Sequence, residues 1–307
     1  MAPLIQIYYK PQTRLEGSDS TEICTRTVQA TPLVSQLRVL CCIHCEDNVP
    51  GILTLHNAMN ATENGLISSY PVHLTELIGR STPLLGPYKI NNMRLMRDST
   101  DRIMKDLSKY SKSFNFSVII QPFRIISLYK IMHDFICKLA QDESVPLFIL
   151  PFPESLEILG KGTSLRSLIM GVEEQSPCTV GIFVDRCLLQ YSGSTELPFK
   201  VAVFFLGGAD DREALALVLR MSGNPEVRIK IFRIHLTGDL QENYMEKNLD
   251  DCLVKEFGDK NIPPGVEYHE IKANVSVQVL DTIRSMESKY DLVVLGKRRV
   301  PKSRLEE

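Results

Sequence analysis

The sequence contains no run of about 18 apolar residues, the length that a helix needs to cross a bilayer. It also lacks an excess of charge: 35 Lys and Arg against 37 Asp and Glu give a formal net charge of −2. No global field therefore favours nucleic acid or an anionic membrane. The first residues, MAPLIQIYYKPQTRLEG, have no basic stretch before their apolar patch and no small-residue cleavage site. We expect no signal peptide, no nucleic-acid partner and a fragment that is soluble in the cytosol.

Signatures of catalysis are missing as well. No serine, cysteine or carboxylate pair shows the local pattern of a hydrolase or transferase, so we predict no enzyme and no catalytic residue. The six histidines are scattered and form no His-x-x-x-His pair. His133 lies at the polar edge of a predicted helix, and His235 and His269 lie near strand ends. Each is a candidate pH sensor if it lies beside a carboxylate, although a solvated or core histidine is the favoured interpretation.

Four of the eight cysteines lie in or beside strand-like apolar runs: Cys41, Cys42, Cys178 and Cys187. These positions favour free thiols in a reducing compartment over a disulfide framework. The segment CCIHC has enough soft ligands for zinc. Strand alternation, however, places Cys41 and Cys45 on one face and Cys42 and His44 on the other. We predict core packing and no metal site.

Short apolar runs alternate with amphipathic segments, which predicts an α/β fold with a mainly parallel sheet and helices on both faces. The strand-like runs are 37–44, 66–74, 116–123, 146–152 and 178–186, followed by 200–206, 227–234, 266–271 and 290–297. The helical segments between them include 128–141, 211–222, 245–257 and 275–289. Strands that alternate with helices in this way are typical of doubly wound, Rossmann-like sheets.

The pattern runs, breaks and restarts, which predicts two tandem units. The first spans residues 36–190 and the second, after a linker at 191–199, spans 200–307. The second unit stops after its fourth predicted strand, so we expect it to be truncated there. An acidic insertion at 237–264 interrupts it. Residues 1–35 show no sustained period and are predicted to be a linker or a partly disordered lead-in.

Residues 201–225, VAVFFLGGADDREALALVLRMSGNP, predict a strand, a glycine turn and a helix. Asp210 and Glu213 fit a capping box, in which each side chain satisfies a free N–H group at the helix start. The alternative is a ligand, because doubly wound sheets bind ligands at the carboxyl ends of their strands. The candidate residues for an anion or regulatory contact are Gly207, Gly208, Asp210, Asp211 and Arg212. Two adjacent carboxylates disfavour a phosphate, so the cap is the preferred interpretation.

A second glycine-rich segment, GKGTS, precedes a predicted helix and resembles an anion cradle. Its candidate residues are Gly160, Lys161, Gly162 and Thr163. A phosphate loop would need a glycine where Ser155 stands, so an ordinary glycine turn is favoured. The basic run GKRRVPKSR, residues 296–304, is a candidate contact for acidic lipid headgroups, with a solvated tail as the alternative.

Several segments together resemble the cytosolic C-terminal region of plant cation/proton exchangers, the CHX family, over about residues 35–300. They include LRVLCCIHCEDNVPGILTL, HLTEL, MHDFIC, LFILPFP, SPCTVGIFVDR, FFLGGADDREALALVLRM and YDLVVLGKR. The resemblance implies a regulatory domain of a K⁺(Na⁺)/H⁺ antiporter that modulates potassium and pH homeostasis. It implies a transmembrane antiporter domain in the same full-length chain as partner, a homodimer, and a place on the cytosolic side of the plasma membrane or an endomembrane.

That region is in turn similar to universal stress protein modules, which implies two units of strand order 3-2-1-4-5 packed as a pseudo-dimer. Many such modules bind ATP through an aspartate that ends strand one and a glycine run after strand four. Here Phe204 stands at the aspartate position, and Arg299 replaces the second glycine after Gly296. In the first unit Val172 follows the surviving Gly171 where Ser or Thr belongs. The resemblance therefore implies that no nucleotide cofactor is held. A nucleotide-binding sensor is the alternative, and an enzyme acting on an adenylated substrate is a third.

Overall fold

The structure of the chain is a computed structural model. It describes residues 2–9, 26–33, 35–59, 67–78, 82–88, 99–113, 118–152, 162–185, 198–236, 244–258, 264–273 and 276–297. The predicted acidic insertion, the GKGTS segment and the basic run therefore fall partly outside the described residues.

The first unit is built around a strand that comes first in its sequence and lies in the middle of its sheet. Its main strands are β2 (Leu37–Ile43), β3 (Ile67–Glu76), β6 (Phe123–Ser127), β7 (Leu147–Phe152) and β8 (Thr179–Val184). They pair in the order β6-β3-β2-β7-β8 and are all parallel, which is 3-2-1-4-5 along the chain. Two short strands extend this sheet: β4 (Leu84–Pro87), antiparallel to β6, and β5 (Val118–Ile120), parallel to β3.

The second unit repeats this arrangement with four strands of its own. They are β9 (Phe199–Phe205), β10 (Val227–Leu236), β11 (Val266–Ala273) and β12 (Leu292–Gly296). Their spatial order is β11-β10-β9-β12, again all parallel. The predicted α/β fold with a mostly parallel sheet is therefore confirmed.

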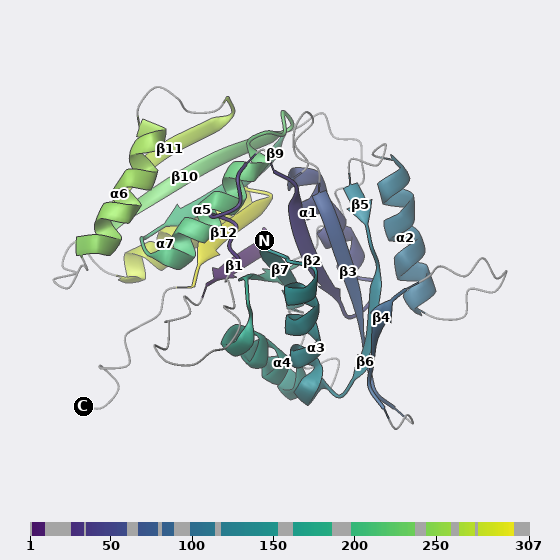
Figure 1. Ribbon diagram of the computed structural model, residues 1–307. Helices are drawn as coiled ribbons and strands as arrows, with labels where there is room; N and C mark the ends of the chain where they lie inside the picture. The colour runs from purple at the N-terminus through teal and green to yellow at the C-terminus, as the bar shows by residue number, and fades with distance from the viewer. Residues whose placement is uncertain are drawn as a thin grey trace, which may run out of the picture.

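The N-terminal residues fill the next position of the second sheet. Strand β1 (Leu4–Tyr8) pairs parallel with β12 and antiparallel with β8. It joins both sheets into one sheet of twelve strands, and is the short purple strand near the centre of Figure 1. The prediction that residues 1–35 are only a lead-in is wrong at this strand. β1 adds a fifth strand to the second sheet, and the predicted truncation of residues 200–307 after their fourth strand stays a prediction. The predicted unit boundaries stay predictions.

An approximate two-fold relation connects the two units. β1 and β8 hold equivalent positions, since each is parallel to the fourth strand of its sheet, β12 and β7. They run antiparallel to one another, as two equivalent elements do across a two-fold axis. The molecule therefore has the internal organisation of a dimer within one chain.

Helices cover both faces of the sheet (Figure 1). The helices on the first face are α1 (Asn48–Met59), α2 (Ser99–Ser113), α5 (Ala209–Met221) and α6 (Tyr244–Gly258). On the opposite face lie α3 (Tyr129–Asp142) and α4 (Gly162–Gln175) in the first unit, and α7 (Ser276–Met286) with a 3₁₀ turn (Glu287–Lys289) in the second. One apolar core on the first face runs from β2 to β9 through Ile5 and Ile7 of β1, whose side chains have 0% exposure.

Strand alternation separates the cysteines of β2. Cys41 lies in the core shared by both units, and Cys42 lies in the core under α3 and α4. Burial raises the pKa of Cys41 to about 12, so the side chain stays a thiol. Among the described residues, no cluster of His, Cys, Asp and Glu could hold a metal ion. None of the described helices combines the length and the apolar character needed to span a bilayer.

Candidate functional site where the two units meet

Two glycines form the turn between β9 and α5. Gly207 has a φ of +115° and Gly208 a φ of +102°, values that L side chains rarely adopt. Gly208 is the N-cap residue of α5, and this position provides no side-chain hydrogen bond to cap the helix. The turn lies at the carboxyl end of β9, beside β12, where the strand order of the sheet reverses. This is the position at which doubly wound sheets bind ligands.

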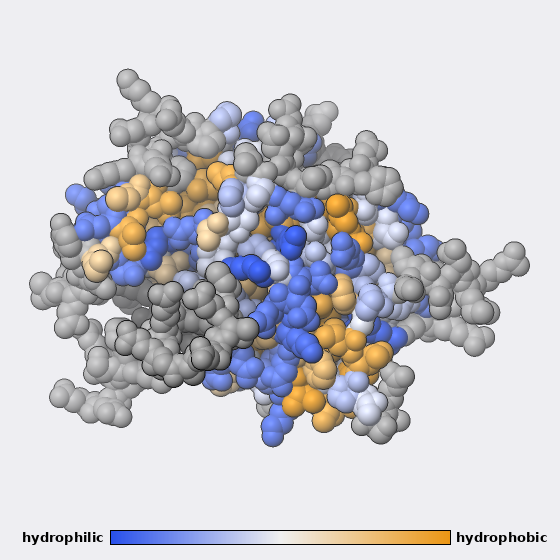
Figure 2. Space-filling view, in the orientation of Figure 1, coloured by the Kyte–Doolittle hydropathy of each residue, from blue (hydrophilic) through white to orange (hydrophobic). Residues whose placement is uncertain are grey.

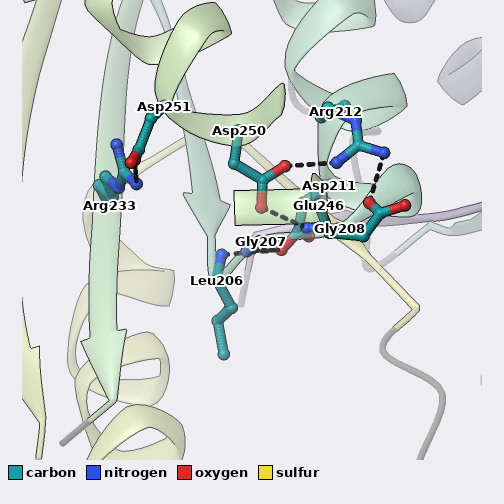
Figure 3. Close-up of polar contacts among 9 residues, drawn as sticks. All are labelled: Leu206, Gly207, Gly208, Asp211, Arg212, Arg233, Glu246, Asp250 and Asp251. Atoms are coloured by element: carbon teal, nitrogen blue, oxygen red, sulfur yellow. Dashed lines mark hydrogen bonds and ion pairs between the residues drawn. The ribbon is translucent and has the colours of Figure 1, made fainter. Parts of the chain in front are cut away.

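Asp211 occupies that position with its own carboxylate. One oxygen, Oδ2, accepts the backbone N–H groups of Leu206 and Gly207 at 2.7 and 2.8 Å, and Oδ1 accepts that of Gly296 at 2.8 Å. The residue is 4% exposed. Burial raises its pKa to about 6, and the three N–H groups lower it in part. Figure 3 shows Asp211 beside Leu206 and Gly207. Together with the contact to Gly296, Asp211 connects the ends of β9 and β12 to the first turn of α5.

A second carboxylate comes from α6. Asp250 accepts the N–H of Gly208 at 2.9 Å through one oxygen and pairs with Arg212 at 2.5 Å through the other. Arg212 also pairs with Glu246 at 2.7 Å, one turn earlier on α6. The guanidinium and Asp250 are largely buried, which favours this paired arrangement over isolated charges. Figure 3 shows Asp250 reaching over the glycine turn from the helix above it.

The other two acidic residues of this turn bind the N-terminal segment. Asp210 accepts the N–H of Tyr9 at 2.8 Å, directly after β1. Glu213 is 2% exposed and accepts the N–H of Val28 and the hydroxyl of Thr179 on β8, each at 2.8 Å. Burial raises the pKa of Glu213. The predicted capping box of Asp210 and Glu213 is therefore wrong: tertiary donors from both units take these carboxylates.

The same helix binds the N-terminal segment at its other end. Arg220 donates to the backbone oxygens of Thr31 and Pro32 at 2.8 Å each. Near the start of α5, Lys297 pairs with Glu173 of α4 at 2.6 Å, which ties the end of β12 to the first unit. We call Asp210, Asp211, Arg212, Glu213 and Asp250 the seam cluster. It connects β1, β8, β9, β12 and α6 at one point.

The seam cluster answers the question of an anion site. The N–H groups that would bind a phosphate, those of Leu206, Gly207, Gly208 and Gly296, all donate to Asp211 or Asp250. The first unit repeats this device, because Asn48 Oδ1 accepts the N–H groups of His44 and Cys45 just after β2, at 3.0 and 3.3 Å. In each unit, side chains of that unit therefore accept hydrogen bonds from the backbone N–H groups of this turn.

The remaining candidates for an anion contact lie in the GKGTS segment. Gly160 and Lys161 lie outside the described residues, and Gly162 and Thr163 open α4 with side chains that are also outside them. A role for these four residues stays a prediction.

The three candidate histidines lie apart. His133 is on α3, 3.3 Å from Asp134, and its ring packs against Gly171 of α4 so closely that a Cβ there would approach it to 2.6 Å. His235 lies 3.6 Å from Glu270 and His269 lies 3.4 Å from Glu267, at the outer strands of the second unit. Each histidine has a carboxylate in reach, but the structure does not bring them together.

Sequence reasoning missed the partners of the cluster. Tyr9 and Val28 lie in the predicted lead-in, and Glu246 and Asp250 lie in the predicted insertion. One signal was available. The alternation of residues 4–8, LIQIY, with two isoleucines two positions apart, is the pattern of a strand.

A family model described as "Plant cation/H(+) antiporter domain" matches residues 69–188, and one described as "Plant cation/H(+) antiporter, C-terminal domain" matches residues 198–307. The chain belongs to the plant cation/H⁺ antiporter family. Among the members of that family, it is 32% identical to Cation/H(+) antiporter 15 of Arabidopsis thaliana over 97% of this chain and 39% of that protein. It is also 32% identical to Cation/H(+) antiporter 23, chloroplastic, of the same plant, over 96% of this chain and 36% of that protein.

The chain spans less than two fifths of the length of these plant antiporters. Among solved structures, it is similar to a universal stress protein from Archaeoglobus fulgidus, with a TM-score of 0.47, 13% identity and 85% of each chain covered. It is also similar to a putative universal stress protein from Pseudomonas aeruginosa, with a TM-score of 0.48, 14% identity, and coverage of 88% of this chain and 86% of that one.

Proposed function

We propose that this chain is a regulatory domain of a K⁺(Na⁺)/H⁺ antiporter. It lies on the cytosolic side of a membrane and modulates cation/proton exchange, and with it potassium and pH homeostasis, through protein contacts. Its partner is the transmembrane antiporter domain of the same full-length chain. The relatives support this proposal, because they are cation/H⁺ antiporters much longer than the chain.

The observation that carries the proposal is the position of β1. A regulatory domain acts on a transporter only if its conformation differs between the transporter's states. If the membrane domain precedes this chain, a displacement of that domain reaches Leu4–Tyr8 before any other described element. Those residues lie between the two sheets, and the next residue, Tyr9, donates its N–H to Asp210 of the seam cluster. Such a displacement would change the contact between the units directly.

The proposal includes a homodimer. The two ends of the sheet are β11 and β4, and the exposed charges Glu267, Glu270 and Lys272 on β11 oppose pairing with another strand. Apolar surface is available instead on α6, where Met245 and Leu249 are 75% and 54% exposed one turn apart. Figure 2 shows apolar residues gathered on the side of the molecule where α6 lies. Sedimentation of the wild type and of Leu249→Lys measures this contact.

The runner-up, a nucleotide sensor, is not favoured by the geometry. A triphosphate needs free N–H groups at the turn after the first strand. In both units those groups already donate to a side-chain oxygen, of Asp211 and Asp250 in one and of Asn48 in the other. A nucleotide would have to displace these side chains. At the turn after β9 it would also meet the carboxylates of Asp210, Asp211 and Asp250.

A chimera tests the regulatory function. This chain replaces the corresponding C-terminal region of Cation/H(+) antiporter 15, and Rb⁺ uptake driven by a pH gradient is measured in vesicles. We expect Glu213→Gln, which alters the contact between α5 and β8, to change the rate or the pH profile of uptake at equal protein abundance. Asp106→Asn, an exposed carboxylate on α2 that pairs with Lys109, is the control and should change neither. Uptake that is identical with the domain intact, altered at Glu213 or deleted would refute the proposal.

A further inference from the structure

Four cations follow one face of α2. Arg102, Lys105, Lys109 and Lys112 are separated by three or four positions, the spacing that brings side chains onto the same side of a helix. All four residues are exposed, and the side chains of Arg102 and Lys109 are 50% and 64% accessible. The rise of an α-helix spreads them over about 15 Å. We call these four residues the basic stripe.

The basic stripe points away from the protein. The buried side chains of α2, among them Ile103, Met104 and Leu107, enter the core shared by the two units. With about 3.6 residues per turn, their mean direction around the helix is opposite to that of the stripe. Figure 1 shows α2 at the outer edge of the first unit, on the right of the view. A straight, outward-facing row of cations suits a flat anionic surface better than a small ligand held in a cavity.

Two carboxylates lie beside the stripe without neutralising it. Arg102 pairs with Glu46 at 2.7 Å and Lys109 pairs with Asp106 at 2.8 Å. The side chains of Glu46 and Asp106 are 45% and 55% exposed, so both pairs are in contact with solvent. Exposed pairs of this kind contribute little free energy, and their cations can exchange one anion for another. Among these residues, four cations against two carboxylates leave an excess of two positive charges.

The fold does not require a basic helix at this place. α6 is the counterpart of α2, because each helix lies between the second and the third strand of its unit in the sequence. Tyr244–Gly258 of α6 contains four carboxylates and two lysines, whereas Ser99–Ser113 of α2 contains two carboxylates and four cations. The exposed side of α6 also includes the apolar Met245 and Leu249. The basic stripe is therefore specific to α2, and a surface charge that the fold does not require indicates a partner of opposite sign.

We propose that the basic stripe is a contact surface for the anionic lipid headgroups of the cytosolic leaflet. That leaflet has a negative surface potential, which attracts Lys and Arg side chains within a Debye length. The contact orients the first unit with α2 toward the membrane and is separate from the seam cluster. The presence of a membrane beside the chain rests on the proposed function, whereas the affinity of the stripe for anionic lipid does not.

Two other kinds of partner fit the stripe less well. Cytosolic loops of membrane proteins carry an excess of Lys and Arg, so they would repel these cations. Single-stranded nucleic acid is bound through aromatic side chains as well as cations, and the four residues of the stripe include no aromatic one. Anionic lipid needs only the positive charge and the straight outer face that α2 presents.

Co-sedimentation with vesicles tests the contact on the wild-type chain. Vesicles of phosphatidylcholine and phosphatidylserine are compared with vesicles of phosphatidylcholine alone, at low ionic strength. We expect binding to the anionic vesicles only, and a loss of that binding as salt is added. Lys105→Gln, Lys109→Gln and Lys112→Gln together should lower the partition coefficient on the order of 100-fold. No binding by the wild type, or equal binding to both kinds of vesicle, would overturn the proposal.

A matched variant separates the stripe from net charge. Lys130→Gln, Lys138→Gln and Arg166→Gln remove the same charge from exposed positions of α3 and α4, on the opposite face of the sheet. This variant should bind vesicles like the wild type, and thermal unfolding is measured to confirm that both triple variants are folded. Equal loss of binding in both would mean that only net charge matters, which contradicts the proposal. Tighter binding of a single-stranded RNA oligonucleotide than of the anionic vesicles would contradict it too. No transport is measured, so the lipid contact and the regulatory function fail separately.

Discussion

The carboxylate of Asp211 accepts the backbone N–H of Gly296 at 2.8 Å, and so connects the first turn of α5 to the end of β12. The same carboxylate holds the turn after β9 through Leu206 and Gly207. A position that could bind a ligand is used instead to join two strands and a helix. Neighbouring side chains of that turn, Asp210 and Glu213, extend the connection to β1 and β8.

Asp211 gives the stability of the chain a specific pH dependence. Burial raises its pKa to about 6 in the folded state, from an ordinary value of 3.8. Its contribution is therefore fully present below about pH 4 and is lost as pH rises through 6. Between pH 4 and 7, we expect the free energy of unfolding of the wild type to fall by about 3 kcal/mol relative to that of Asp211→Asn, as measured by urea unfolding. Asp106→Asn, an exposed carboxylate on α2, is the surface control. If both variants run parallel to the wild type, Asp211 is not buried as described.

Glu213 is the buried acceptor between α5, β8 and the N-terminal segment. Glu213→Ala leaves the donors of Val28 and Thr179 without this partner. We expect a loss of about 3 kcal/mol in the free energy of unfolding, because unsatisfied buried donors cost about 1–3 kcal/mol each. Glu213→Gln keeps one acceptor oxygen and should lose about half as much. A value for Glu213→Ala within experimental error of the wild type would contradict the described contact.

The two glycines of the turn differ in their surroundings. At Gly207 an added Cβ would lie 2.8 Å from Asp250, whereas at Gly208 it would meet nothing within 4 Å. Both have a positive φ, so alanine costs about 1–2 kcal/mol at each. We expect thermal unfolding to rank Gly207→Ala as more destabilised than Gly208→Ala. Gly86→Ala, with open space and no positive φ, is the control and should be close to neutral. The reverse ranking would place Asp250 elsewhere.

Calorimetry with ATP tests the occupied turn. The N–H groups of Gly207, Gly208 and Gly296 donate to Asp211 and Asp250, and three carboxylates surround them. We expect no binding at micromolar ATP, and dissociation constants of millimolar or weaker for ATP, AMP and cyclic nucleotides. Micromolar binding that Gly208→Val abolishes would support the nucleotide sensor instead.

The repeated strands could be predicted because each carries its own signal. Runs such as Val201–Phe205 and Leu147–Phe152 are apolar enough to mark buried parallel strands without any knowledge of their neighbours. β1 has only five residues, and its partners lie far along the chain, so its place could not be read locally.

The glycine turn after β9 could be predicted from the sequence, but the partners of its acidic side chains could not. The spacing of Asp210 and Glu213 suits a capping box, yet donors from Tyr9, Val28 and Thr179 compete for these carboxylates once the chain is folded. Asp250, which lies on a helix in the predicted insertion, accepts the N–H of Gly208 where a phosphate could bind. Nothing in the local sequence of the turn indicates this contact.

β1 lies between the two sheets and pairs with both β8 and β12, and one crosslink tests this arrangement directly. Gln6 of β1 faces Ile182 of β8 across the antiparallel pair. Directly opposed residues have Cβ atoms about 4.5–5.5 Å apart, close to the separation that a disulfide requires. We expect Gln6→Cys with Ile182→Cys to form an intramolecular disulfide under mild oxidation, located by peptide mass mapping. Gln6→Cys with Phe183→Cys, which point to opposite faces, should not. Equal crosslinking of both pairs, or of neither, would show that β1 does not join the units.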